Sequence, residues 1–313
     1  MNIIERPLVS FVLIAYNQEE YIKEAIEGAL SQTYSPLEII LSDDCSRDRT
    51  FEIMREVAES YQGPHKIILN RNDPNLGIGG HINRVMSLSS GEFIVIGAGD
   101  DISLPERVSI NVKTWQEKPD TKLIYSDCYF VDESGDILEI HEPGPKMQNE
   151  SLDNVITRNL WCLGAVSAIH RSVFDYFGPL MDGIVHEDRA WPTRAKLLGS
   201  ISYINEPLIK YQAFGGVSRD YMTKNDWLLS KSVKWYSNFI NDYKQKVLDL
   251  KLSNSDYKII QSCENKINEH CMNKAMAEGT LSIISIFSSK VSLSFKLKLI
   301  LKKIKRRALL CVS

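Results

Sequence analysis

Pairs of adjacent aspartates stand at two points of the sequence where a hydrophobic run ends. Asp43 and Asp44 follow the run LEIILS, and Asp100 and Asp101 follow EFIVIGAG. One such pair is usually a solvated loop or a helix cap, but two pairs on one rim suit a hard divalent cation that bridges carboxylates to a phosphate. A cation also offsets the repulsion between these carboxylates and an anionic ligand. The pattern therefore predicts a site for a metal-bound diphosphate.

A third acidic pair, Glu187 and Asp188, opens the stretch HEDRAWPTRAKLLGS, which we expect to form a helix with Pro192 in its first turn. The helix dipole favours acidic residues there, which is a structural explanation for the pair. Adjacent carboxylates also raise each other's proton affinity, which favours a role as a base. We expect the preceding His186 to be structural or exposed.

The elements that must position these residues alternate in the first half of the chain. We predict strands at 8–16, 37–44, 65–72 and 92–99, and helices at 20–32, 48–61 and 80–88. Parallel strands require crossover connections, so the alternation indicates a mostly parallel sheet flanked by helices. Such sheets bind ligands at the carboxyl ends of their strands, where both aspartate pairs should open onto one edge.

The second half of the chain is mixed. We predict two strands joined by a tight turn at 122–140, a strand and short helix ending at Gly178, a strand pair at 201–212, and helices from about residue 221. The predicted domains are an α/β domain at 1–220 and a helical extension at 221–313.

Charge is distributed unevenly along the 313 residues, whose net charge is −3. Eight of the 37 lysines and arginines lie after Thr280, where there is no acidic residue, so the other 280 residues carry 29 basic and all 40 acidic groups. An acidic body argues against a nucleic-acid-binding protein. The six cysteines form no CxxC motif or zinc-like cluster, and the first residues lack a signal-peptide pattern. We expect reduced thiols and a cytoplasmic location.

The basic C-terminal segment has the pattern of an interfacial helix. Its expected apolar stripe consists of Leu293, Leu297, Ile300, Leu301, Ile304 and Ala308. Lysines and arginines cover the other faces, and no nearby uncharged run is long enough to span a bilayer. We predict that this helix holds the protein peripherally on the inner face of the cell membrane; the alternative is a terminal helix that packs on the body.

Known nucleotide-binding motifs are missing. A dinucleotide-binding fold needs G-x-G-x-x-G after its first strand, where this chain has AYNQEE. The segment GIGGHI matches weakly, follows the third strand and has Ile82 in place of the last glycine. There is no P-loop either, so nicotinamide-dependent oxidoreductase and kinase-like functions are disfavoured.

Four ordered motifs resemble the family 2 glycosyltransferases, which have the GT-A fold. The segment VSFVLIAYNQEEYIKEAIEGALSQTYSPLEIILSDDCSRDRT resembles the opening of that family, and the likeness continues through NLGIGGHINRVMSLSSGEF, GAGDDISLPERV and HEDRAWPTRAKLLG. It covers about residues 7 to 212. The resemblance implies an inverting transferase that uses a nucleotide-diphosphate sugar, most simply a UDP-sugar, with Mn²⁺ or Mg²⁺. The implied acceptor is a glycan or a polyprenyl-diphosphate-linked sugar in bacterial surface polysaccharide (O-antigen or capsule) biosynthesis.

The resemblance also implies roles for single residues. Asp44 would accept a hydrogen bond from the base, Asp100 and Asp101 would hold the metal, and Asp188, with Glu187 beside it, would be the general base. The implied donor-binding residues are Ala15, Tyr16, Asn17, Glu19, Asp44, Asn83 and Gly99.

Two positions depart from the family pattern. Ala98 replaces the first aspartate of the DxD metal motif, and Phe214 replaces a histidine often found after the last strand. Ala98 keeps open a catalytically inactive sugar-binding or scaffold protein. A nucleotidyltransferase of similar fold is a second alternative, although AYNQEE lacks the glycine-rich basic loop of those enzymes. Trp161 and Trp191 flank the implied acceptor side, where an indole could stack on a sugar or simply be buried.

Overall fold

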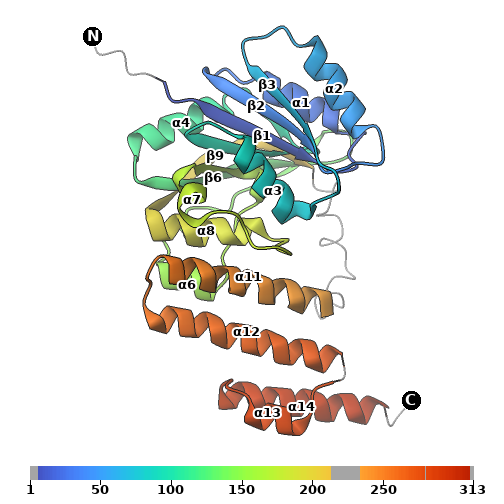
Figure 1. The fold of residues 1–313 in the computed structure, drawn as a ribbon, viewed down its shortest axis with the longest axis vertical. Helices are drawn as coiled ribbons and strands as arrows, with labels where there is room; N and C mark the ends of the chain where they lie inside the picture. The colour runs from blue at the N-terminus through green and yellow to red at the C-terminus, as the bar shows by residue number, and fades with distance from the viewer. Residues whose placement is uncertain (1–5, 213–232, 279, 311–313) are drawn as a thin grey trace. The chain divides into compact units, whose positions relative to one another are not determined.

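The computed structural model describes residues 6–212, 233–278 and 280–310. Figure 1 shows the chain, which divides into two compact units, Met1–Tyr221 and Met222–Ser313. The first unit contains the strands and all of the candidate site residues. The assignment of the two units to donor-binding and membrane functions stays a prediction.

The first unit is built on one nine-stranded sheet in the described part of the chain, with the order β3-β2-β1-β4-β8-β6-β9-β5 and with β7 paired to β6. The four strands β3, β2, β1 and β4 are parallel, and β8 runs antiparallel between β4 and β6. The strands are β1 Val9–Ala15, β2 Leu37–Asp43, β3 Lys66–Arg71, β4 Phe93–Ala98, β5 Ile102–Ser103, β6 Thr121–Val131, β7 Ile137–His141, β8 Ser167–His170 and β9 Ser200–Gln212. The predicted mixed α/β fold with a mostly parallel sheet is confirmed.

Helices connect these strands (Figure 1). They are α1 Ile22–Leu30, α2 Thr50–Ser60, α3 Gly77–Leu88, α4 Arg107–Glu117, α5 Lys146–Asn149, α6 Leu152–Thr157, α7 Ser172–Phe177 and α8 Glu187–Leu198, with a 3₁₀ turn, η1, at Gly164–Val166. The chain moves from β1 outward to β3 and then back to β4. Right-handed crossovers therefore place α1 and α2 on one face of the sheet and α3 on the other. In agreement, α1 contacts α2, whereas α3 contacts α8.

The core explains why the central strands read as unbroken apolar runs. β1 and β2 are covered on both faces, and Phe11, Val12, Ile39 and Ile40 are fully buried. Helix α1 buries the stripe predicted from its spacing, which includes Ile22 and packs against the sheet.

One strand prediction was wrong, and one helix was not predicted. Residues 201–212 were expected to form two strands, but β9 is one strand of 13 residues. Its register against β6 jumps from Ser126↔Ile204 to Asp127↔Pro207, so a bulge takes up the proline that suggested a break. Helix α4 was not anticipated.

Pro192 was expected in the first turn of its helix, but it is the sixth residue of α8. A proline at this position has no N–H to donate to the carbonyl oxygen of Asp188, four residues earlier. The helix hydrogen-bond ladder is therefore interrupted directly over Asp188. This interruption was not visible in the sequence, because it depends on which residue begins the helix.

The second unit is helical where it is described. Its helices are α11 Val233–Leu252, α12 Tyr257–Ala277, α13 Ile283–Ser288 and α14 Leu293–Leu310, and α11 packs along α12. A small core formed by Met272, Leu281, Ile286, Val291 and Leu299 joins α12, α13 and α14. None of the described helices is long and apolar enough to cross a membrane.

The apolar stripe predicted on the last helix is divided in the structure. Leu293, Leu297 and Leu301 are 70%, 54% and 59% exposed. Ile300 instead packs against the core with Leu299, because α14 must bury one side on α12 and α13. The side chains of Ile304 and Ala308 lie outside the described residues.

Candidate active site

The carboxyl ends of β1, β2 and β4 meet at one edge of the sheet, as the sequence predicted. Ala15 pairs with Asp43, and Ile14 pairs with Ala98. The hydrogen bonds continue past the strands, because the N–H of Asp44 donates to Ala15 O (3.0 Å) and the N–H of Gly99 donates to Ile14 O (2.9 Å). The two aspartate pairs therefore flank the same end of β1.

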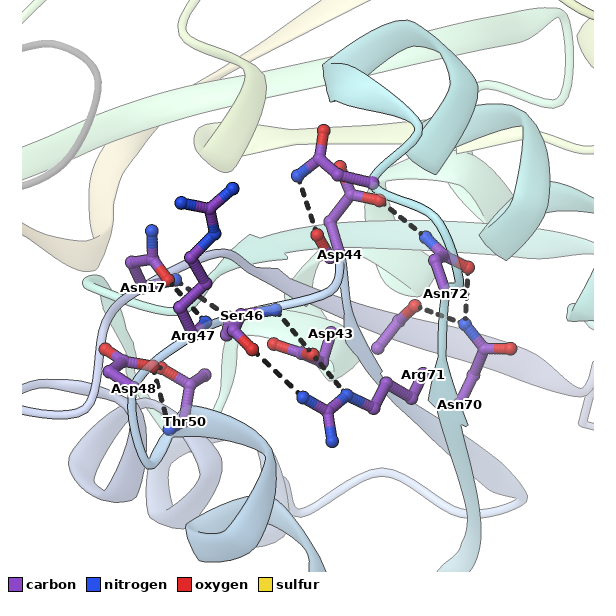
Figure 2. Close-up of polar contacts among 12 residues, drawn as sticks. Asn17, Asp43, Asp44, Ser46, Arg47, Asp48, Thr50, Asn70, Arg71 and Asn72 are labelled. Carbon is purple, nitrogen blue, oxygen red and sulfur yellow. Dashed lines mark hydrogen bonds and ion pairs between the residues drawn. The ribbon is translucent and has the colours of Figure 1, made fainter.

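The loop after β1 and the loop after β2 hold each other (Figure 2). The N–H of Asn17 donates to Ser46 Oγ at 2.8 Å, and Asn17 Oδ1 accepts from the N–H of Arg47 at 2.9 Å. Glu19 Oε2 likewise accepts from the N–H of Arg49 at 2.9 Å. Asn17 has the left-handed φ of 52°, which asparagine tolerates better than most residues.

These contacts bear on the residues predicted to line the nucleotide pocket. Asn17 and Glu19 use their side chains to shape the rim, and Ala15 is buried at the end of β1. Tyr16, directly after β1, is 43% exposed. All of these residues stay predicted donor contacts.

Of the two carboxylate oxygens of Asp44, only Oδ1 accepts hydrogen bonds from the described residues. Asp44 Oδ1 accepts from Asn72 Nδ2 at 2.8 Å and from the N–H of Leu76 at 2.9 Å, while its carbonyl oxygen accepts from Asn75. Asp44 is 3% exposed, and its Oδ2 is an acceptor that the described residues leave without a hydrogen bond. A contact from Oδ2 to a ring N–H of the base stays a prediction.

The neighbouring Asp43 is structural. It is fully buried, and its Oδ2 accepts from the N–H of Ser46 at 3.0 Å and lies 3.5 Å from Arg71 Nε (Figure 2). Arg71 also donates to Ser46 O, so this ion pair closes the turn that follows β2. Asp43 Oδ1 has no hydrogen-bond partner among the described residues, but the residue is fully buried, so we assign no ligand contact to it.

Gly99 and Asp100 follow β4 at the same edge. A Cβ on Gly99 would lie 2.6 Å from both Ala15 Cβ and Gln18 Oε1, so the glycine is required for protein packing. A donor contact by Gly99 stays a prediction. Asp100 is half-buried, and burial raises the pKa of its carboxyl, whereas hydrogen bonds from its own N–H and from Gln18 lower it.

Asp101 faces the protein interior. Its Oδ1 accepts from the N–H of Gln212 at 2.9 Å, and the residue is 4% exposed. Burial, together with the charge of Asp100, raises the pKa of Asp101 well above its usual value, and the nearby Arg107 opposes that shift. These are the surroundings of a structural carboxylate that ties the loop after β4 to the end of β9. Its role as a metal ligand stays a prediction.

Helix α3 connects the base-binding side of the edge to the start of α8. A Cβ on Gly79, in the first turn of α3, would lie 2.6 Å from Ile184 O. Further along, Asn83 exchanges two hydrogen bonds with the backbone of Leu180, at 2.7 and 2.8 Å. Asn83 was predicted to face the donor, but the structure gives both ends of its amide to Leu180.

Glu187 and Asp188 begin α8 close to η1. A Cβ on Gly164 would lie 2.6 Å from Glu187 Oε1, and the charges of both carboxylates, together with burial, raise the pKa of the Cys162 thiol. The turn η1 contacts β4, the strand that ends at Ala98. The acidic start of α8 is therefore linked to the sheet edge both through η1 and through α3.

The residues present fit a divalent cation in a limited way. The described residues contain no cluster of three or more histidine, cysteine or acidic side chains that could hold a metal. Mg²⁺ commonly uses one or two carboxylates together with substrate phosphates and water. Asp100 fits that arrangement, with most ligands supplied by a diphosphate. Ala98, two residues earlier, contributes no oxygen.

Several residues at this edge were missed by sequence reasoning. Asn72 and Gln18 contact the predicted site residues directly, and Arg107 lies behind Asp101. For Asn72, a polar residue at the last position of the predicted strand 65–72, its place beside the expected sheet edge was the available signal. Trp191 is 1% exposed and so cannot stack on a sugar. Trp161 is half exposed, and the guanidinium of Arg189 lies over its ring. Phe214 lies outside the described residues.

Solved structures with the same fold are glycosyltransferases. Residues 1–349 of Staphylococcus aureus TarS in complex with UDP-GlcNAc superpose with a TM-score of 0.60 at 18% identity, covering 91% of this chain and 76% of TarS. The mannosyltransferase PcManGT of Pyrobaculum calidifontis, in complex with GDP-Man and Mn²⁺, gives 0.56 at 15% identity, covering 99% and 82%. The fold is thus that of the GT-A glycosyltransferases.

Sequence comparison assigns the family. The model of Glycosyl transferase family 2 matches residues 10–177, and the chain belongs to this family. An uncharacterised glycosyltransferase of Methanocaldococcus jannaschii is 36% identical over 142 residues, covering 45% of this chain and 48% of the relative. WfaP of Escherichia coli, a UDP-Glc:α-D-GlcNAc-diphosphoundecaprenol β-1,3-glucosyltransferase, is 32% identical over 122 residues, covering 39% and 46%. The chain spans about half the length of the curated relatives it matches.

Proposed function

We propose that this chain is an inverting glycosyltransferase that moves a sugar from a nucleotide-diphosphate sugar, most simply a UDP-sugar, to a hydroxyl of a glycan or polyprenyl-diphosphate-linked acceptor. The observation that carries the proposal is the sheet edge where Asp44 and Asp100 flank the end of β1, linked to the acidic start of α8. The UDP-GlcNAc complex of TarS and the lipid-linked acceptor named for WfaP support the donor and acceptor classes.

In this proposal Asp188 is the general base. Its carboxylate takes the proton of the acceptor hydroxyl as that oxygen attacks the anomeric carbon. The bond between that carbon and the diphosphate oxygen breaks on the opposite face, and its electron pair leaves with the nucleoside diphosphate. Asp44 holds the base, and Asp100 would hold a Mn²⁺ or Mg²⁺ ion that supplies charge stabilisation for the diphosphate.

The proposal extends to a place at a membrane. Leu293, Leu297 and Leu301 are exposed along α14, with Lys298 and Lys302 also exposed between and after them. Exposed leucines with interleaved lysines and no acidic residue suit an anionic lipid surface. That location suits a lipid-linked acceptor in surface polysaccharide biosynthesis.

A donor screen tests the proposed reaction. The protein is incubated with UDP-, GDP- and dTDP-sugars and Mn²⁺, and slow hydrolysis of one donor is expected. Asp188→Asn should lower turnover at least about 100-fold, because general-base catalysis contributes about 10²–10⁴-fold, while donor binding stays nearly unchanged. Glu187→Gln is the matched control at the adjacent position. If the protein neither turns over nor binds any donor in the panel, the proposed enzymatic function is wrong. An unchanged rate in Asp188→Asn would show that Asp188 is not the base.

A further inference from the structure

A chain of hydrogen bonds lies behind Asp44 and consists of residues with no role so far. We propose that Ser42, Asn70 and His81 are positioning residues that orient Asn72 and Asp44 so that one oxygen of Asp44 is presented to the nucleotide base. This inference rests on the proposed function, because it concerns the recognition of the same donor.

The chain is continuous in its distances. His81 Nε2 lies 2.7 Å from Ser42 Oγ, and Asn70 Nδ2 donates to the same hydroxyl at 2.9 Å. Asn70 Nδ2 also donates to Asn72 Oδ1 at 3.0 Å, and Asn72 Nδ2 donates to Asp44 Oδ1 at 2.8 Å. Figure 2 shows Asn70, Asn72 and Asp44 in this succession. The chain thus joins the ends of β2 and β3 to helix α3, which carries His81.

The directions of the hydrogen bonds made by Asn70 and Asn72 are determined by their neighbours. Arg84 Nε donates to Asn70 Oδ1 at 3.3 Å, so the amide nitrogen of Asn70 is the group that faces Ser42 and Asn72. Asn72 then accepts with its oxygen and must turn its amide nitrogen to Asp44. Ser42 Oγ accepts from Asn70 Nδ2 and also contacts His81 Nε2, and the tautomer of His81 decides whether Ser42 Oγ or His81 Nε2 is the donor.

His81 takes part in the chain as a neutral ring. It is 3% exposed, and burial lowers its pKa to about 4, although the charge of Asp44 acts in the opposite direction. The neutral imidazole hydrogen-bonds Ser42 Oγ through Nε2, as acceptor in one tautomer and as donor in the other. Loss of any member would therefore leave a buried donor or acceptor unmatched and release the amide of Asn72 to rotate.

The consequence is a constraint on the base. With Asn72 and Leu76 N–H both committed to Oδ1, Asp44 can offer only Oδ2 as an acceptor. Uracil, thymine and guanine present a ring N–H to such an oxygen, whereas cytosine presents a lone pair that the carboxylate repels. The positioning residues should therefore influence the preference between bases as well as the affinity.

Calorimetric binding of UDP, GDP and CDP to the full chain tests the inference. Wild type is expected to bind UDP or GDP in preference to CDP. Ser42→Ala and Asn70→Asp should weaken that binding about tenfold, the order expected for one lost charge-assisted hydrogen bond, and narrow the preference over CDP. Asn70→Asp is informative because a carboxylate cannot donate to Ser42 or Asn72.

Matched variants separate positioning from general stability. Ser10, on β1, is as fully buried as Ser42 and donates to Glu38 at 2.6 Å, so Ser10→Ala should lower the melting temperature similarly without changing nucleotide affinity. His81→Gln places an amide oxygen near the Nε2 position and should retain affinity, whereas His81→Leu should lose it.

The outcomes separate a failure of the positioning role from a failure of the proposed function. If wild type binds UDP or GDP and the folded Ser42→Ala and Asn70→Asp proteins bind as tightly and as selectively, the positioning role is wrong and the proposed function stands. Equal losses in Ser10→Ala and Ser42→Ala would also overturn the positioning role. If wild type binds none of these three nucleotides and does not bind dTDP either, both the proposed function and this inference are wrong.

Discussion

In each aspartate pair at the sheet edge, one carboxylate is occupied by the protein and the other is left to the rim. Asp43 closes the turn after β2 with Ser46, and Asp101 holds the N–H of Gln212. Asp44 keeps an oxygen without a hydrogen bond to the described residues, and Asp100 is half-buried at the rim. Adjacent carboxylates tolerate each other here because they accept hydrogen bonds from different parts of the protein: Asp43 from Ser46 and Asp44 from Asn72 and Leu76, Asp100 from Gln18 and Asp101 from Gln212.

Ala98 is the residue at which metal dependence should be tested. Ala98→Asp restores a second carboxylate two residues before Asp100, and an added anionic oxygen ligand should strengthen cation binding. We expect Mn²⁺ to promote UDP binding at an about tenfold lower concentration, within the 10–100-fold range of metal-site changes. Mn²⁺ titrations followed by calorimetry measure this, with Ala98→Asn as a control of similar size without charge. An identical Mn²⁺ dependence in all three proteins would contradict the prediction.

His81 should make stability depend on pH. Burial lowers its folded-state pKa to about 4 from the ordinary value of 6.5, so below pH 6.5 the unfolded chain binds a proton that the folded protein does not. Stability is therefore lost as pH falls from 6.5 towards 4. Between pH 7 and pH 5 this loss is about 2 kcal/mol. Urea unfolding at both pH values should show it in wild type, and His81→Gln should lose correspondingly less; an equal loss in both proteins would refute the assignment.

At the scale of elements, Arg107 joins parts of the fold that are distant in sequence. Its guanidinium donates to Ser103 Oγ at 2.9 Å and to Ile96 O at 2.8 Å. It also donates to Ala165 O at 2.6 Å and to Ser167 O at 3.2 Å. One buried side chain at the start of α4 thus connects β4, β5, η1 and β8. These elements carry Asp100 and support the start of α8.

Removal of Arg107 should destabilise the whole first unit. Arg107→Met removes the donor from one hydroxyl and three carbonyl oxygens, and it removes the cation that lowers the pKa of the buried Asp101 carboxyl, so a loss of about 3–5 kcal/mol in unfolding free energy is expected. Arg49→Met, which removes an exposed arginine 3.7 Å from Glu56, should cost less than about 1 kcal/mol. Chemical denaturation of both variants measures the difference.

A double variant tests the electrostatic part of this prediction. Asp101→Asn in the Arg107→Met background removes the buried carboxyl group whose pKa Arg107 lowers, so part of the lost stability should return. If the two substitutions are additive, Arg107 acts through its carbonyl contacts alone.

At the scale of the whole molecule, an excess of positive charge and several exposed apolar side chains occur together in the residues after Thr280. The body is acidic, whereas the residues after Thr280 carry eight basic groups and no acidic one. The described part of that segment also exposes Ile284 (80%) and Phe287 (62%) on α13. Five of the six cysteines are described and none forms a disulfide, so no covalent crosslink among them holds these regions.

Vesicle binding tests the membrane proposal with the full chain. Sedimentation with phosphatidylglycerol-containing vesicles should be strong at low salt and weak at high salt, because exposed charges are screened. The double variant Leu297→Glu and Leu301→Glu should lose binding. Leu248→Glu on α11, at a leucine that is 52% exposed, should not. Equal binding of all three proteins, or none by wild type, would contradict a lipid-binding role for α14.

Much of the fold followed from local patterns. Strand and helix periodicity placed β1 to β4 and α1 to α3 within a few residues, and crossover geometry brought Asp44 and Asp100 to one edge. Predictions were wrong where a proline suggested a local boundary but the rest of the fold determined the structure around it. Pro207 suggested a strand break that a bulge against β6 absorbs. Pro192 was expected in the first turn of its helix but is the sixth residue of α8.

The sequence by itself determined the order of the elements, the family and the edge at which the carboxylates gather, because apolar periodicity and right-handed crossovers act on neighbouring segments. Only the tertiary structure decided which carboxylate of each pair is internal, how α3 and η1 link the start of α8 to that edge, and that a chain from His81 to Asn72 orients Asp44. These depend on strand register and on contacts between residues 28 to 111 positions apart, which local sequence patterns do not encode.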